Sequence, residues 1–262
     1  MTIPDPSVQE AKRQRLFLVL CLIFLTNALI AEIIGGKIFS VETMLGLPPA
    51  QLLIAGQKLD FNMTAGVINW PIVFVTSDII NEYFGRKGVK RISYLTAAFI
   101  AYTFITVLAA TKLPPAQFWL DINGTDNQGN SFNINDAFSR IFNQGLGIMI
   151  GSIVAFLLGQ ILDVSVFSWL RRRTGSRFMW LRATGSTMFS QLVDSFVVIT
   201  IAFYVFGNWD LKQVFSVGSI NYLYKGAVAI LLTPILYGAH YLIDNYLGKE
   251  YAEELSHKAA HE

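Results

Sequence analysis

The sequence is poor in charged residues and in cysteine. Only 15% of its 262 residues are Asp, Glu, Lys or Arg, whereas soluble proteins average about 25%. The net charge of +2 is too small to indicate a protein that binds nucleic acid. Cys21 is the only cysteine, which excludes an intrachain disulfide and a CxxC metal or redox motif.

The motifs of common catalytic sites are also missing. His240 stands alone in an apolar run, and His257 and His261 lie in a polar C-terminal segment. The chain has no HExxH, GxSxG or Walker A motif, so a zinc hydrolase, a serine hydrolase and an ATPase are not indicated. Two Asp residues on different helices are a candidate aspartyl dyad, but the Gly-rich GxGD context is absent. We therefore predict a protein that is not an enzyme and that needs no cofactor or metal.

Apolar residues dominate instead. They make up 53% of the chain, and the mean hydropathy is +0.47. A membrane-spanning helix needs roughly 20 apolar residues, and lipid forces backbone groups to bond within their own segment. The sequence thus predicts an all-α integral membrane bundle of six transmembrane helices, near residues 16–36, 63–85, 92–112, 146–169, 184–207 and 219–247.

The remaining segments are predicted to lie outside the membrane. Residues 1–15 and 248–262 are expected to be polar tails that flank a transport domain at 16–247, and no cleavable signal is recognised. Residues 113–145 are rich in Asn, Asp and Gly and indicate a loop, with a short interfacial helix around Phe138–Phe142. The segment 41–59 is too short to span and is interpreted as interfacial or re-entrant.

Basic residues predict the orientation, because Lys and Arg gather in cytoplasmic loops. They cluster before the first span, between the second and third, and between the fourth and fifth: Lys12, Arg13, Arg15, Arg86, Lys87, Lys90, Arg91, Arg171, Arg172, Arg173, Arg177 and Arg182. The alternate loops hold far fewer. Both termini are therefore expected to be cytoplasmic, in a multi-pass protein of the inner (cytoplasmic) membrane.

The second predicted span carries polar residues that are costly in lipid. Trp70, Phe74, Asp78, Asn81 and Glu82 fall on one helical face. An Asp in a span costs roughly 2.5–3.5 kcal/mol on insertion scales, and such residues usually face the bundle interior. This face is a candidate binding surface.

The fourth and fifth spans share a Q-x-x-D pattern. GQILDVSVF contains Gln160 and Asp163, and SQLVDSFVV contains Gln191 and Asp194. Polar positions repeated in two parts of a transporter commonly flank its binding site. We interpret these four residues as candidate ligand contacts, together with Tyr222 and Lys225 of the sixth span, which also carries Asn221.

Structural roles are the alternative for several of these residues. Glu32 and Lys225 both lie toward the outer side and form a candidate ion pair, and Glu82 is close enough to Arg86 to extend to the cytoplasmic surface. Helix packing is the favoured interpretation of Asn27 and Asn69. Trp70 also fits an aromatic belt residue.

Carboxylates, amides and aromatic rings together suit a flat, nitrogen-rich ligand. A carboxylate accepts two N–H groups from one edge of a guanine-like ring, and an amide matches a ring that carries a carbonyl beside an N–H. Aromatic side chains offer stacking faces.

Four segments together carry a resemblance to a known family. WPIVFVTSDIINEYFGRKGVKR, GQILDVSVF, STMFSQLVDSFVVITIAF and INYLYKGAVAILLTPILYG resemble, in this order, the queuosine precursor transporter family, also described as vitamin-uptake-like six-span membrane proteins. The resemblance extends from about residue 15 to 247. It implies import of 7-cyano- or 7-aminomethyl-7-deazaguanine, or queuine, and binding roles for Asp78, Glu82, Gln160, Asp163, Gln191, Asp194 and Lys225.

One family feature is missing. An Arg often lies near the outer start of the fourth span in the family, where this chain has GLGIMIGS around Gly147. A contact made by such an Arg is therefore not expected here, and the preference among the precursors is left open.

Three functional hypotheses follow. The first is a secondary-type importer in which Asp163 and Asp194 bind ring N–H groups, Gln160 and Gln191 bind the carbonyl edge, and Phe74 or Trp70 stacks; Asp78 or Glu82 would carry a coupled proton. The second is the substrate-binding subunit of an ATP-driven energy-coupling-factor importer. The third is an intramembrane enzyme or assembly factor. The expected partners are the small-molecule 7-deazaguanine and the lipid bilayer, with no nucleic acid, and a homodimer is left open.

Overall fold

The computed structural model describes residues 6–35, 37–54, 56–142, 146–174, 178–205 and 208–260. Five helices in these ranges are long and apolar enough to cross a membrane. They are α1 (Pro6–Ile34), α3 (Trp70–Thr111), α6 (Leu146–Thr174), α7 (Met179–Ile199), which continues as the π-helix η2 (Thr200–Val205), and α8 (Leu211–Leu247). The all-α class is confirmed, although the five long helices differ from the six that we predicted.

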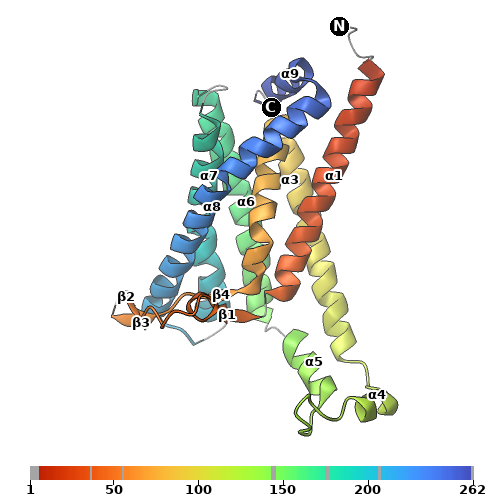
Figure 1. The fold of residues 1–262 in the computed structure, drawn as a ribbon, viewed down its shortest axis with the longest axis vertical. Helices are drawn as coiled ribbons and strands as arrows, with labels where there is room; N and C mark the ends of the chain where they lie inside the picture. The colour runs from red at the N-terminus through yellow and green to blue at the C-terminus, as the bar shows by residue number, and fades with distance from the viewer. Residues whose placement is uncertain are drawn as a thin grey trace.

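The difference lies in α3, which contains both the second and the third predicted span. A straight helix of its 42 residues would be about 63 Å long, roughly twice the hydrocarbon thickness of a bilayer. The helix is broken at Gly85, whose φ of 70° and ψ of −178° are not helical and are accessible to glycine because it has no Cβ. Figure 1 shows the half before Gly85 rising toward the end of the bundle that holds both termini, and the half after it running back.

The long helices pack side by side around an apolar interior. The helix α1 packs on α3, α6 packs on α3 and α7, and α8 packs on α7. Phe24, Ile80, Val89 and Phe167 are almost completely buried between them. Large apolar side chains such as that of Leu231 cover the outside of the bundle, as expected for helices that face lipid.

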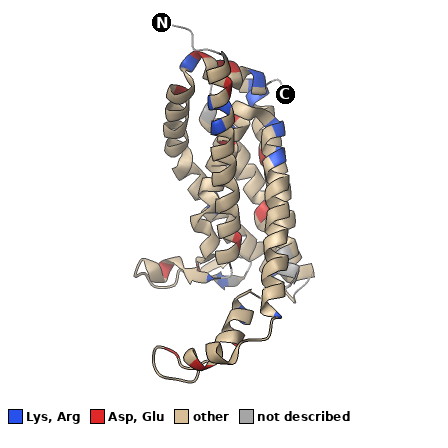
Figure 2. Cartoon of the chain, turned by 90° about the vertical axis from the view of Figure 1, so that its right-hand side faces the viewer, with Lys and Arg blue, Asp and Glu red and all other residues tan. Residues whose placement is uncertain are grey.

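Both termini lie at the same end of the bundle, which we call the terminal end. Figure 2 shows Lys and Arg gathered there and few charged residues along the middle of the bundle. The helix α9 (Lys249–Ala260) covers this end and buries Ala252 and Leu255. The predicted C-terminal tail is thus mostly helical.

The opposite end carries short elements that the sequence analysis did not predict. The segment 41–59, interpreted as interfacial or re-entrant, forms α2 (Val41–Met44) and the antiparallel strands β2 (Leu52–Ile54) and β3 (Gln57–Leu59). On either side of it, β1 (Ile38–Ser40) pairs with β4 (Asn62–Thr64), and the 3-10 helix η1 (Ala65–Ile68) leads into α3.

Glu42 ties this segment together. Its Oε1 accepts hydrogen bonds from the backbone N–H groups of Phe61 at 2.7 Å and Ala50 at 3.4 Å, and its Oε2 accepts one from the Ser40 hydroxyl at 3.0 Å. The Phe61 N–H is the largest cause that holds the pKa of Glu42 below its ordinary value. The Glu42 carboxylate therefore links three parts of this segment by hydrogen bonds, in addition to the few bonds of its short strands.

Two further elements depart from the predicted boundaries. The helix α8 begins at Leu211, eight residues before the predicted start at 219, because Asp210 and Gln213 form a capping box with bonds of 2.8 and 2.9 Å. In the predicted loop 113–145 the structure forms α4 (Gln117–Ile122) and α5 (Ile134–Phe142). The helix expected around Phe138–Phe142 is thus present.

Candidate ligand-binding site

A pocket of about 350 Å³ lies within the bundle, between α3, α6, α7 and α8. The lining combines aromatic, amide and charged side chains: Trp70, Phe74, Phe156, Gly159, Gln160, Asp163, Ser190, Gln191, Asp194 and Lys225. Seven of the residues that the sequence singled out are in this set.

The two Q-x-x-D segments line the same pocket from two helices in contact. Gln160 and Asp163 lie one turn apart on α6, and Gln191 and Asp194 lie one turn apart on α7. The two helices pack along each other, so a three-residue spacing brings all four polar groups to one cavity. The similar segments thus build one site together.

Neighbouring serines orient two of these groups. The Ser77 hydroxyl donates to Gln160 Oε1 at 3.1 Å, which leaves the Gln160 amide N–H groups available as donors. The Ser190 hydroxyl lies 3.3 Å from Asp163 Oδ1. Asp163 is 4% exposed, and burial of a charged carboxylate requires such partners.

Gln191 has an unused acceptor. Its side chain is 2% exposed, and within the described ranges its Oε1 has no hydrogen-bond partner. A buried acceptor without a partner costs free energy. Because Gln191 lines the pocket, a ligand N–H is a natural partner for this oxygen.

Asp194 and Lys225 form an ion pair in the wall of the pocket. Their side chains are about one-fifth exposed, at 19% and 21%. The predicted Glu32–Lys225 pair is wrong in this structure, because Lys225 contacts Asp194 and Glu32 accepts the Ser152 hydroxyl at 2.6 Å. The reason is that Lys225 lies on α8 opposite α7, whereas Glu32 on α1 faces α6.

Three aromatic rings form another wall. The rings of Trp70 and Phe74 are stacked, with centroids 5.9 Å apart and planes 19° apart. Phe156 lies tilted against Trp70 at 5.8 Å. Trp70 therefore lines the pocket, a role that the aromatic-belt interpretation alone did not include.

Asp78 lies outside this pocket, in a second cavity. That cavity has about 260 Å³ and lies between α3, α7 and α8, with Phe74 in both linings. Asp78 is 6% exposed, and its Oδ1 has no hydrogen-bond partner in the part of the chain that the structure describes. The two cavities thus share the Phe74 side chain in their linings.

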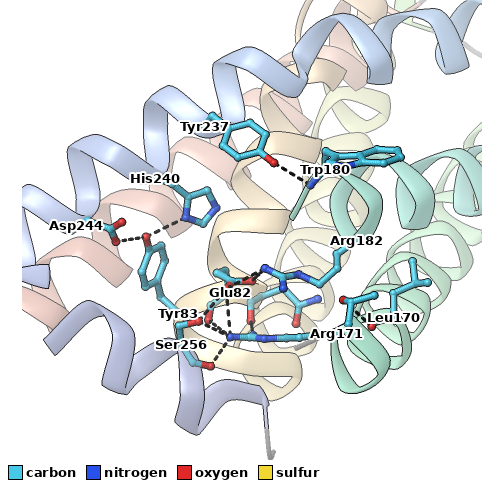
Figure 3. A network of polar contacts seen from close by, with 12 residues as sticks. Glu82, Tyr83, Leu170, Arg171, Trp180, Arg182, Tyr237, His240, Asp244 and Ser256 are labelled. Atoms are coloured by element: carbon cyan, nitrogen blue, oxygen red, sulfur yellow. Dashed lines mark hydrogen bonds and ion pairs between the residues drawn. The ribbon is translucent and has the colours of Figure 1, made fainter. Parts of the chain in front are cut away.

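Glu82 lies farther along α3, in a buried ion cluster at the terminal end. Its carboxylate lies 3.3 Å from Arg171 and from Arg182, and it accepts the Ser256 hydroxyl at 2.8 Å (Figure 3). The expectation that Glu82 extends to the surface beside Arg86 is wrong, because the side chain is 5% exposed and bound to two arginines of other helices.

Asn81 and Tyr222 do not line the pocket. Asn81 is buried beside Glu82, and its backbone oxygen accepts Arg171 at 3.2 Å. Tyr222 is half-buried on α8, less than one turn from Lys225. The side chains around Gly147, where the family Arg is missing, lie outside the described residues.

Asn27 and Asn69 have the packing role that we favoured. The Asn69 amide donates to Asn27 Oδ1 at 2.9 Å, and the Asn27 amide donates to the backbone oxygen of Ile23 at 2.8 Å. This pair joins α1 to the start of α3.

The sequence analysis missed the burial of two arginines and a polar triad beside them. Arg171 and Arg182 are 5% and 1% exposed, although both sit in runs that resemble ordinary cytoplasmic flanks. Tyr83 OH donates to Asp244 at 2.6 Å and lies 2.9 Å from His240 Nδ1 (Figure 3). No local pattern reveals these contacts, since the partners lie on different helices.

Across the described parts of the chain, no three His, Cys, Asp or Glu side chains are grouped closely enough to hold a metal ion. The chemistry of the pocket is instead that of hydrogen bonding and stacking. Donors, acceptors and aromatic rings line this pocket together.

Comparison with known proteins yields one family. The family model described as "Putative vitamin uptake transporter" matches residues 64–239. A "Probable queuosine precursor transporter" of Bacillus subtilis (strain 168) is 30% identical over 188 residues, which cover 71% of this chain and 76% of that protein. A protein of Haemophilus influenzae with the same description is 27% identical, over 70% of this chain and 71% of that protein. A "Queuosine precursor transporter" of Escherichia coli (strain K12) is also 27% identical, over 69% of this chain and 73% of that protein. No solved structure matches the chain.

Proposed function

Because the chain belongs to this family of queuosine precursor transporters, we propose that it imports queuosine precursors across the cytoplasmic membrane as a secondary-type transporter. The observation that carries the proposal is the pocket in which two Gln–Asp pairs face an aromatic wall. These groups match the edges and the face of a 7-deazaguanine ring.

Six membrane crossings fit this role. The halves of α3 on either side of Gly85 would each cross the bilayer, and the other four long helices would cross once. The basic terminal end would lie in the cytoplasm, because Lys and Arg are retained there. The strands β1–β4 and the helices α4 and α5 would then face outward.

The contacts in the pocket suggest how the ring binds. Asp163 would accept ring N–H groups with the acceptor capacity that its neighbouring hydroxyls leave free on the two carboxylate oxygens. The Gln160 amide would donate to the ring carbonyl, and the unused Gln191 oxygen would accept another N–H. Trp70 or Phe74 would stack on the ring face.

Of the two carboxylates considered for proton coupling, Asp78 fits better than Glu82. Glu82 has two arginine partners, whereas Asp78 lies buried with an unpartnered oxygen in the described structure, next to the cavity beyond Phe74. A proton would offset the cost of burying that carboxylate. If import into proteoliposomes ignored an imposed pH gradient, the coupling role of Asp78 would be lost and uniport would be retained.

The direct test is ligand binding and uptake by purified protein. Wild type and Asp163→Asn are titrated with 7-cyano-7-deazaguanine, 7-aminomethyl-7-deazaguanine, queuine and guanine, beside Asp136→Asn in the exposed helix α5 as a matched control. We expect micromolar binding that falls at least about tenfold in Asp163→Asn, since hydrogen bonds to charged groups contribute about 1.5–3 kcal/mol, and no change in the control.

Uptake by the protein alone separates the alternatives. Import into liposomes without other proteins supports the secondary-type transporter. Binding without import would favour the substrate-binding subunit of an ATP-driven importer. If folded protein bound none of the compounds, the proposed substrate would be refuted. The carboxylates would then have structural roles, or the protein would be an intramembrane enzyme or an assembly factor.

A further inference from the structure

Lys225 is the one basic residue that lines the pocket within the described structure. It comes from α8 and contacts Asp194 of α7, and both residues line the pocket. An ammonium group has three donors. One is engaged by Asp194, and the others remain available to a ligand.

The ion pair lies on the side of the pocket away from Asp163. A Cβ placed on Gly159 would lie 3.7 Å from Asp194 Oδ1, so this carboxylate is next to Gly159. Gly159 precedes Asp163 by about one turn of α6, a rise of roughly 6 Å. A bicyclic ring that presents its N–H edge to Asp163 would therefore point its five-membered ring, with the 7-substituent, at Asp194 and Lys225.

The Asp194–Lys225 pair should bind some 7-substituents of the ligand ring better than others. Lys225 compensates Asp194, so the charge of this carboxylate is already paired and is less available to a ligand cation. A primary amine is protonated at neutral pH, as lysine is, and two ammonium groups that share one carboxylate repel each other strongly away from water. A neutral substituent that accepts a hydrogen bond, such as a nitrile, would instead use the free Lys225 donors.

We propose that Lys225 is a specificity-determining residue, which selects 7-deazaguanines with a neutral, hydrogen-bond-accepting 7-substituent over those with an alkylammonium group. This inference rests on the proposed function. It assigns a selective role to the Lys225–Asp194 pair, beyond the binding role that the resemblance implies.

The test compares two ligands in each variant. Dissociation constants for 7-cyano- and 7-aminomethyl-7-deazaguanine are measured by calorimetry at pH 7 for wild type, Lys225→Met, Lys225→Arg and a control, Lys112→Met, at the exposed end of α3. The ratio of the two constants is used because it does not depend on the fraction of folded protein.

We expect wild type to prefer the cyano compound by about tenfold or more, the scale of one hydrogen bond to a charged group. Lys225→Met frees Asp194 and should shift the ratio at least about tenfold toward the aminomethyl compound. Lys225→Arg and Lys112→Met should retain the wild-type preference. Asp194→Asn, which leaves the ammonium without its counter-charge, should shift the ratio further toward the cyano compound and gives a second readout if Lys225→Met does not fold.

Two results would overturn the inference and leave the proposed function intact. One is wild-type protein that binds the aminomethyl compound as tightly as the cyano compound, or more tightly. The other is a ratio that stays constant in Lys225→Met and Asp194→Asn. Loss of the proposed function would look different, because folded wild-type protein would then bind neither compound.

Discussion

Removing the charge of Glu82 should be one of the most destabilising single changes in the protein. Glu82→Gln leaves Arg171 and Arg182 buried beside each other without their shared carboxylate. Removing one partner of a buried ion pair costs about 3–5 kcal/mol, because the remaining charge is not compensated. For a chain of this size, that loss corresponds to a decrease of about 6–20 °C in the unfolding temperature.

Thermal unfolding of purified protein in one detergent measures this effect. The matched control is Glu254→Gln, whose carboxylate pairs with Lys258 at 2.5 Å on the surface of α9. Exposed pairs contribute about 0–1 kcal/mol, so the control should shift the midpoint by no more than about 4 °C.

A double variant tests the physical reason. In Glu82→Gln with Arg182→Gln, one carboxylate and one guanidinium are removed together, so the loss should be clearly smaller than the sum of the two single losses. Strict additivity, or a midpoint for Glu82→Gln that matches the surface control, would refute the argument that compensation of buried charge maintains this cluster.

Three further predictions concern other parts of the fold. Asn27→Ala and Asn69→Ala should each lower the free energy of unfolding by about 1 kcal/mol. The double variant should lose little more than either single variant, because the two side chains hydrogen-bond to each other. Additive losses in thermal unfolding would contradict this. Gly85→Ala should destabilise by about 1–3 kcal/mol, since a φ of 70° with a ψ of −178° is essentially restricted to glycine, whereas Gly238→Ala, with open space at its Cβ, should not. The lowered pKa of Glu42 means that its contribution is complete above the ordinary value of 4.5 and is lost as the pH falls below that value toward the folded-state pKa. The protection factor of the Phe61 amide hydrogen, relative to its intrinsic exchange rate, should therefore fall in acid, and Glu42→Gln should remove that pH dependence.

The sequence predicts the helical bundle and much of the pocket because both depend on short-range patterns. Apolar runs define the long helices, and a three-residue spacing brings Gln160 to Asp163 and Gln191 to Asp194 on one side of each helix. Trp70 and Phe74 follow from the same argument at a spacing of four. These inferences need only the helical period and the cost of polar groups in lipid.

The missed features depend on contacts between distant residues. Glu82 meets Arg171 and Arg182 at separations of 89 and 100 residues, and nothing local distinguishes buried arginines from cytoplasmic ones. The partner of Lys225 depended in the same way on how α8 packs against α7. The strands at residues 38–64 are only three residues long, too short for an alternating pattern to be recognised.

The contact between Glu82 and Ser256 also has a consequence for how the protein is made. Ser256 belongs to α9, which is synthesised after the five long helices, and its hydroxyl binds a carboxylate that lies 174 residues earlier in the chain. The long helices can insert before α9 is made, but the cluster that joins α3, α6 and α7 gains its partner on α9 only afterwards. A chain cut short after α8 would therefore contain all five of the long apolar helices that the structure describes and still lack the segment that binds Glu82 and Arg171 through Ser256.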